Sequence, residues 1–150
     1  LDRFMFNIWV DYPSYEEELS IVNATTGDKD VKINQVLSLE EILEFQKLVR
    51  KIPVAENVIQ YAVTLCNKTR PNSPLSNDLV KKYISWGAGP RASQFLIIGA
   101  KCHALLNGKY SPDIEDVKMV AKPILRHRVV KNYIAEADGL SIDDIIDSIL

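Results

Sequence analysis

The chain has 150 residues, 47% of them hydrophobic, which is enough for a single domain with one well-buried core. Its 18 Lys and Arg residues and 20 Asp and Glu residues give a net charge of −2, so the sequence lacks the electrostatic footprint of a protein that binds nucleic acid or an anionic membrane. Its apolar runs are far shorter than the roughly 18 residues of a membrane-spanning helix, and it does not open with a signal peptide. We therefore expect a cytoplasmic protein with no membrane span, whose partners are proteins and nucleotide.

Residues 4–10 have the two-residue period of a β-strand. The face that this period makes apolar consists of Phe4, Phe6, Ile8 and Val10. At Pro13 the strand pattern gives way to a helical one. We therefore predict a boundary here, which divides the chain into residues 1–12 and residues 13–150.

Two helices with the same start signal are predicted next. The pattern Ser-x-x-Glu, a capping box, occurs at Ser14 and again at Ser38. The first helix is expected to end at Gly27 and the second before Pro53. A polar connector, residues 28–36, joins them.

The rest of the chain is predicted to be a bundle of helices. Residues 90–107 are apolar almost all round, so this segment should be the central helix. The remaining helices are predicted at about residues 55–67, 76–85, 111–124 and 141–149. The stretch 125–133, rich in valine and basic residues, fits either a fraying helix end or a short strand. The predicted fold class is thus mainly α, a bundle of about six to seven helices with one short N-terminal strand.

The cysteine and histidine patterns do not predict a metal site. Cys66 and Cys102 lack the paired spacing of a zinc or redox motif, so both are predicted to be buried free thiols. His103 falls in the apolar arc of its helix with no second metal-type residue, which favours a core histidine. Trp9 and Trp86 are predicted to be packing anchors, and the acids at 113, 115 and 116 to be partners of a helix dipole.

The most informative segment is Gly87-Ala88-Gly89-Pro90-Arg91, which opens the most apolar helix. Proline suits the first helical position, because its missing N–H costs nothing there. Arg91 then lies in the first turn, where a cation opposes the helix dipole unless its guanidinium meets a carboxylate or a phosphate. We therefore expect an anion at this helix start, which is either a phosphate or a carboxylate of the chain such as Asp78 or Glu115.

Five segments together carry a family resemblance. They are Leu1-Asp2-Arg3-Phe4-Met5-Phe6, Val10-Asp11-Tyr12-Pro13-Ser14-Tyr15-Glu16-Glu17-Glu18, Thr69-Arg70-Pro71, Gly87-Ala88-Gly89-Pro90-Arg91-Ala92-Ser93 and Ile124-Leu125-Arg126-His127-Arg128. In this order, over nearly the whole chain, they resemble the carboxyl-terminal part of a MoxR-type AAA+ ATPase of the magnesium-chelatase-like branch. The resemblance implies that residues 1–12 are the last strand of an α/β ATPase core and residues 13–150 its helical lid.

The resemblance also assigns roles to two arginines. Arg3 would be the arginine finger, a catalytic residue that reaches the nucleotide of a neighbouring subunit. Arg91 would be sensor 2, which binds the cofactor in the γ-phosphate region, within its own subunit or across an interface. A planar, always-charged guanidinium suits both tasks better than lysine.

ATP and Mg²⁺ are the implied cofactors of the longer protein. This chain contains no Gly-x-x-x-x-Gly-Lys-Ser/Thr phosphate loop and no Walker B strand, so it is not expected to bind them tightly or to hydrolyse ATP by itself. It resembles the lid half of an ATPase without the nucleotide-binding half.

Two functions fit these observations. In the first, the chain is the lid of an ATPase ring that couples ATP hydrolysis to chaperone-like remodelling or maturation of a client complex. The family resemblance implies that this ring is a hexamer. Its partners would then be its own ATPase core, neighbouring subunits and a von Willebrand factor A domain protein. In the second, the chain is a non-catalytic helical interaction module in which Arg91 is structural. Arg126, His127 and Arg128 fit contacts with phosphate or a neighbouring subunit as well as salt bridges to acids of the lid.

Overall fold

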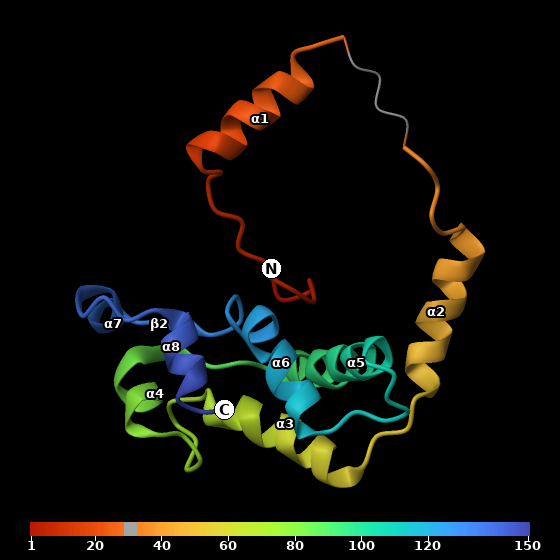
Figure 1. Cartoon of the computed structure of the whole chain (residues 1–150). Coiled ribbons are helices and arrows are strands. Elements are labelled where there is room, and N and C mark those ends of the chain that lie inside the picture. Colours follow the sequence, from red (N-terminus) through yellow and green to blue (C-terminus); the bar gives the residue numbers. More distant parts are fainter. Residues whose placement is uncertain (29–32) are drawn as a thin grey trace.

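Helices dominate the computed structural model of the chain, which describes residues 1–28 and 33–150 (Figure 1). The described elements are, in chain order, α1 (Tyr15–Thr25), α2 (Leu39–Lys51), α3 (Glu56–Lys68), α4 (Asp78–Tyr83), β1 (Ile84–Trp86), α5 (Pro90–Leu106), α6 (Ile114–Leu125), β2 (Val130–Lys131), α7 (Tyr133–Ala137) and α8 (Ile142–Asp147). The mainly α fold class is confirmed.

Helix α5 is the central helix of the bundle, as predicted, and it packs against α3, α6 and α2. It presents small side chains to its neighbours, because Ala92, Ala100 and Ala104 are fully buried. At Gly99 a Cβ atom would lie 3.1 Å from Ile124 Cδ1. Small residues at this face therefore let α6 approach α5 closely. Gly108, in the left-handed conformation at φ 72°, ends the segment as predicted.

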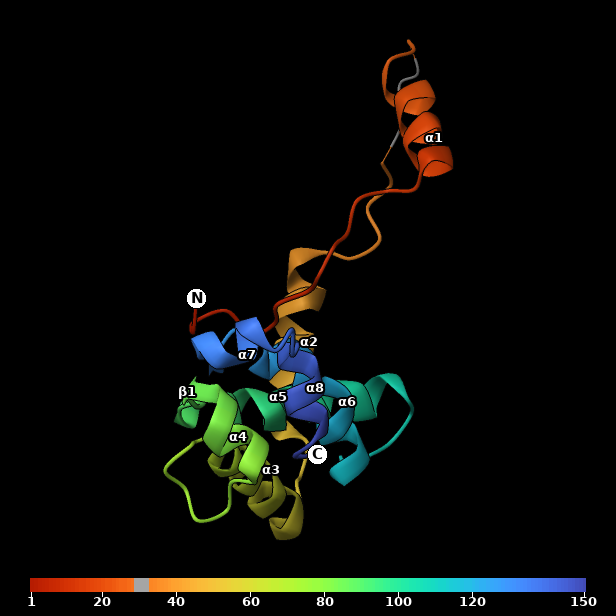
Figure 2. The same cartoon turned by 90° about the vertical axis from the view of Figure 1, so that its left-hand side faces the viewer.

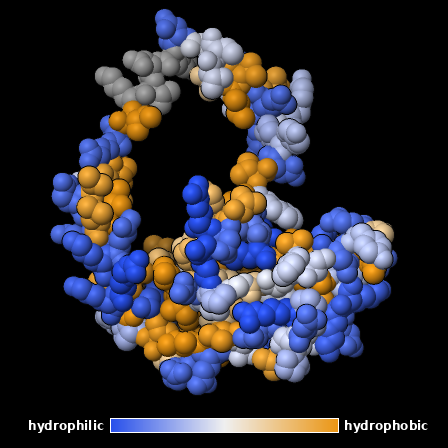
Figure 3. Space-filling view, turned by 180° about the vertical axis from the view of Figure 1, so that it is seen from behind, coloured by the Kyte–Doolittle hydropathy of each residue, from blue (hydrophilic) through white to orange (hydrophobic). Residues whose placement is uncertain are grey.

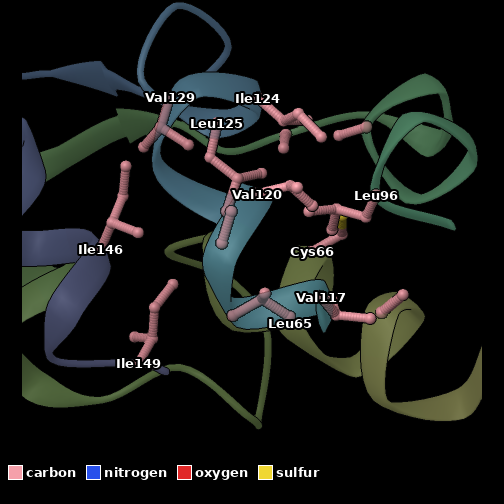
Figure 4. Packing of buried hydrophobic residues seen from close by; sticks show 14 of the residues in the cluster. Leu65, Cys66, Leu96, Val117, Val120, Ile124, Leu125, Val129, Ile146 and Ile149 are labelled. Carbon is pink, nitrogen blue, oxygen red and sulfur yellow. The ribbon is translucent and has the colours of Figure 1, made fainter. Parts of the chain in front are cut away.

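One apolar cluster fills the space between α3, α5, α6 and α8 (Figure 4). The side chains labelled in Figure 4 are Leu65, Cys66, Leu96, Val117, Val120, Ile124, Leu125, Val129, Ile146 and Ile149. Burial of this area from water is the main stabilising contribution to the fold. The predicted free thiol of Cys66 is buried, whereas that of Cys102 is only half-buried.

A small antiparallel ladder pairs β1 with β2, with Ile84 opposite Lys131 and Trp86 opposite Val130. This decides the stretch 125–133 in favour of a short strand after a turn. The ladder also shortens the helix predicted at 76–85, because residues 84–86 belong to β1. Helix α7 was not predicted.

Helices α1 and α2 form an arch that rises from the bundle, and α1 lies far from it (Figures 1 and 2). Both capping boxes are present, so the start signals at Ser14 and Ser38 are confirmed. Within the described part of the chain, neither helix has a buried residue. Apolar side chains are visible along the arch as well as on the bundle (Figure 3). Residues 29–32 of the predicted connector lie outside the described residues.

The strand expected at residues 4–10 is a wrong prediction, because this segment is coil that lies on the bundle. The N–H of Asn7 donates to the Pro123 carbonyl oxygen at 2.8 Å, and Met5 packs against the core. A strand requires a neighbouring strand to pair with, and among the described residues none lies beside this segment. The alternation of apolar residues alone is therefore not sufficient to form one.

One further expectation is corrected. Trp9 and Trp86 are 63% and 74% exposed, so they do not anchor the core.

Among the residues that the structure describes, no helix is both long enough and apolar enough to pass through a lipid bilayer.

Candidate functional site

The approach to α5 is fixed by the Thr69-Arg70 segment. Thr69 Oγ1 accepts a hydrogen bond from the Ala88 N–H at 2.8 Å, and Arg70 Nε donates to the Ala88 carbonyl oxygen at 3.0 Å. A Cβ atom at Gly87 would lie 2.6 Å from the Thr69 carbonyl oxygen and from Arg70 Cα, so glycine is required by this close approach. The segments 69–71 and 87–93, which both carry the family resemblance, therefore contact each other. This contact fixes the position of the first turn of α5, where Arg91 lies.

Arg91 occupies the first turn of α5 and meets an anion there, as predicted. Its Nη1 lies 2.6 Å from Asp2 Oδ2, and the two side chains are 50% and 54% exposed. In the described structure the N-cap residue Gly89 makes no side-chain capping bond to the first turn of α5. The carboxylates suggested by the sequence were Asp78 and Glu115. The partner is instead Asp2, 89 residues away in the chain.

Arg128 uses all five of its N–H groups, and four of them hold the N-terminal segment on the bundle. Nε donates to Asp2 Oδ1 at 3.1 Å, Nη2 to the carbonyl oxygens of Asp2 and Phe4, and Nη1 to those of Met5 and Ile124. The side chain is only 1% exposed. Burial lowers the pKa of this guanidinium, and its bonds to Asp2 oppose that effect. Because its donors are fully used, Arg128 is an anchor rather than a phosphate ligand.

Arg126 fastens the next part of the same segment. Its Nη2 lies 2.8 Å from Asp143 Oδ2, and Nη1 donates to the Asn7 carbonyl oxygen at 3.4 Å. The guanidinium also stacks over the Trp9 ring at 4.7 Å, which accounts for the position of that exposed tryptophan. The structural role considered for Arg126, a salt bridge to an acid of the bundle, is therefore the one that the geometry favours.

His127 makes a third contact of this kind. Its Nε2 lies 3.0 Å from the Phe4 carbonyl oxygen, and since a carbonyl only accepts, Nε2 carries the proton. Burial is the largest cause that lowers the pKa of His127, so the neutral form dominates at pH 7. Arg126, His127 and Arg128 thus all bind the N-terminal segment.

Arg3 lies on the segment that these three residues hold, directly after Asp2. Its guanidinium lies 5.1 Å from the centroid of the Phe4 ring, and the residue is exposed. Among the described residues its side chain has no hydrogen-bond or salt-bridge partner. The structure therefore brings the peptide that carries Arg3 to the first turn of α5, where Arg91 lies.

A second polar cluster connects the end of α5 with the start of α6. His103 Nδ1 lies 2.7 Å from Asp116 Oδ1, and Lys109 Nζ lies 3.1 Å from both Asp116 carboxylate oxygens. His103 is thus a half-buried hydrogen-bond partner of Asp116 rather than the core histidine that was predicted. Asp116 is fully enclosed, and not merely a helix-dipole partner.

Burial raises the pKa of Asp116, but bonds from Asp113, His103 and Lys109 outweigh burial and lower it. The charge is therefore compensated inside the protein, and the cluster holds two helices together. Within the described part of the chain, no three His, Cys, Asp or Glu side chains gather closely enough to hold a metal ion.

The sequence interpretation missed one residue of the site, Asp2. For Arg128 it left open a contact with phosphate or a neighbouring subunit and a salt bridge to an acid, and the structure shows a salt bridge to Asp2. Asp2 has one signal, its place beside Arg3 in a segment that resembles a family motif. Its pairing with Arg91 depends on the fold of the N-terminal segment, which no local pattern predicts.

Comparison with known proteins agrees with this arrangement. Residues 76–149 match the model of the AAA lid domain family. The chain is 36% identical over 149 residues to chaperone MoxR1 of Mycobacterium tuberculosis, an alignment that covers 99% of this chain and 39% of that protein. The chain belongs to the MoxR-type AAA+ family and carries its lid domain. It spans about two fifths of the length of the curated relatives that it matches.

Two other proteins are similar to this MoxR-type lid chain over nearly all of its length. The uncharacterized protein YeaC of Bacillus subtilis is 25% identical over 151 residues, covering 100% of this chain and 44% of that protein. The crystal structure of a putative ATPase from Cytophaga hutchinsonii superposes with a TM-score of 0.86 and 32% identity, over 99% of this chain and 45% of that chain.

Proposed function

We propose that this lid works in a ring-forming ATPase, in which Arg3 is the arginine finger and Arg91 is sensor 2. One observation carries the proposal: the peptide with Arg3 is held against the first turn of α5, where Arg91 projects, through Asp2. Residues 1–12 would belong to the ATPase core and residues 13–150 to the lid. The short N-terminal segment would then connect Arg3 with Arg91, two arginines whose exposed guanidinium groups can bind a phosphate.

The chemistry of phosphoryl transfer supports these roles. Charge spreads over the γ-phosphoryl oxygens in the transition state, and the protein mostly positions and neutralises groups. Among Arg3, Arg91, Arg126 and Arg128, the two anchors Arg126 and Arg128 are engaged with the N-terminal segment. Arg3 and Arg91 are exposed, so their guanidinium groups are available to an anion. When bound, ATP supplies the reacting phosphate and Mg²⁺ compensates part of its charge. Arg3 and Arg91 would bind the terminal phosphate and no other part of the nucleotide.

The exposed apolar residues of the arch support contacts with other parts of such an assembly. Large side chains that are well exposed there include Tyr15, Leu19, Val22, Leu39 and Phe45. Exposed apolar faces on helices commonly mark interaction surfaces. We propose that they face the ATPase core and neighbouring subunits, in a cytoplasmic hexamer that remodels or matures a client complex, together with a von Willebrand factor A domain protein. MoxR1 is named a chaperone, which agrees with such a task.

A subunit-mixing experiment tests the roles of the two arginines in the ATPase that contains this chain. Arg3→Ala should lower turnover by on the order of 10³-fold, because it removes a charge that acts in the transition state. Combining Arg3→Ala subunits with subunits mutated in the phosphate loop should restore part of the activity, since each kind supplies what the other lacks. Arg91→Ala should change ATP affinity or ring assembly without unfolding the subunit.

The alternative function is a non-catalytic helical interaction module, which the exposed apolar faces would serve equally well. It makes the opposite prediction in the same assay. If Arg3→Ala and Arg91→Ala both hydrolyse ATP at the unaltered rate with unchanged assembly, both assignments fail and the interaction module becomes the better explanation.

A further inference from the structure

The carboxylate of Asp2 lies between two guanidinium groups of unlike character. Arg128, on the Oδ1 side, is buried and has used all its donors. Arg91, on the Oδ2 side, is half exposed and binds Asp2 through Nη1. The Arg128 bond is therefore part of the fold, whereas the Arg91 bond can be exchanged for another anion without uncovering a buried charge.

Asp2 also occupies the place that a phosphate at Arg91 would need. Carboxylate and phosphate oxygens bind a guanidinium in the same way, through short charge-assisted hydrogen bonds. A carboxylate that is already bound to Arg91 competes with a phosphate for the same N–H donor, and its negative charge also repels the phosphate. The exposed Asp2–Arg91 pair contributes little to stability by itself, so a competing anion has only a small cost to overcome.

We propose that Asp2 is a positioning residue that binds Arg91 when no phosphate is present and releases it to a phosphate. This inference rests on the proposed function, because it takes Arg91 to meet the terminal phosphate of a nucleotide. Since Asp2 precedes Arg3 directly, the exchange at Arg91 changes what holds the peptide of the arginine finger. Whether a phosphate is bound at the start of α5 would thereby affect the position of Arg3, because Asp2 and Arg3 are adjacent in the chain.

The substitution Asp2→Asn separates this role from a purely structural one. Asparagine retains an oxygen that accepts from Arg128 Nε, but it removes the charge that competes for Arg91. The proposal predicts that tripolyphosphate binds the Asp2→Asn chain about two- to fivefold more tightly, which corresponds to the loss of one exposed ion pair. A carboxylate with only a structural role would give unchanged or weaker binding when it is neutralised.

The measurement is a titration of the chain with tripolyphosphate, followed through the side-chain Nε–Hε NMR signals of its arginines. Asp138→Asn is the matched control, because it removes one charge from another exposed ion pair, with Lys82. Arg91→Gln in the Asp2→Asn background should abolish the gain. Binding that is not tightened by Asp2→Asn, or is tightened equally by Asp138→Asn, would overturn the proposal while leaving Arg91 as an anion site.

A second measurement needs no substitution, so it holds even if the Asp2→Asn chain does not fold. In the unaltered chain, the carboxyl carbon signal of Asp2 and the Nε signal of Arg91 should change along the same saturation curve. Saturation of Arg91 with an unchanged Asp2 signal contradicts the exchange. No response of Arg91 to tripolyphosphate in any variant would instead remove the anion site, and with it the sensor role of Arg91 in the proposed function.

Discussion

The arch and the bundle are both helical, but different forces hold their helices. In the bundle, α5 and α6 bury apolar faces against each other, and the side chains of Leu96 and Leu125 are completely enclosed. In the arch, α1 and α2 have good capping boxes, yet within the described residues they bury no side chain. Short helices are marginal in water without packing, and α2 packs on α5, so α1 depends more strongly than α2 on what covers it in an assembly. Local signals specify where a helix starts, and burial determines how firmly it is held.

The largest expected difference between the two regions concerns truncated leucines. Leu96→Ala in α5 should lower the free energy of unfolding by about 2–5 kcal/mol, because it leaves a cavity in the core. Leu19→Ala in α1 should change it by less than about 0.5 kcal/mol, because that side chain is 42% exposed. Urea denaturation of both variants measures the two values. Similar losses would mean that α1 packs in solution on a surface that the chain itself provides.

A smaller difference is expected for two serine caps, one in the arch and one in the bundle. Ser38 caps α2 in the arch, and Ser141 caps α8 in the bundle, each through a reciprocal capping box. Ser141→Ala should lower the free energy of global unfolding by about 1 kcal/mol, because α8 folds together with the core. Ser38→Ala should leave global stability unchanged and accelerate amide hydrogen exchange in α2 only. Equal effects of the two variants on global stability would show that arch and bundle unfold as one unit.

The smallest expected effect tests whether the N-terminal segment belongs to the bundle. Burial lowers the pKa of His127 in the folded chain, so below its ordinary value of 6.5 the unfolded chain binds more protons than the folded one. The free energy of unfolding should therefore decrease as the pH falls through the window directly below 6.5, and recover as it rises. His127→Asn should flatten this slope in pH-dependent thermal unfolding. If His127→Asn leaves the pH dependence of the unfolding free energy unaltered, then a group other than His127 titrates in this window.

Much of the fold could be predicted from the sequence because its signals are local. Ser14 and Ser38 marked two helix starts correctly, and the helix predicted at about residues 141–149 is present as α8. The failures concern features that need a distant partner. The alternation in residues 4–10 indicates a strand, but pairing depends on a neighbour that local sequence does not reveal.

The candidate site was predictable to a similar degree. Pro90 followed by Arg91 indicated an anion at a helix start, and the structure has one. Asp2 could not be named from the sequence, since the pair spans 89 residues and depends on how the N-terminal segment lies. The roles proposed for Arg3 and Arg91 come from a family resemblance, and they stay predictions until the mixing assay is done.

The anchor Arg128 has a consequence for how residues 2–5 can vary. Three of its five bonds go to main-chain carbonyl oxygens of this segment, at Asp2, Phe4 and Met5. Any residue supplies such an oxygen, so the anchor is insensitive to which side chains stand at positions 4 and 5 as far as hydrogen bonding is concerned. It is sensitive to spacing instead: one residue inserted or deleted directly after Asp2 would move the carbonyl oxygens of Phe4 and Met5 out of register with the guanidinium. Arg128 therefore fixes how far the peptide that carries Arg3 extends from the bundle.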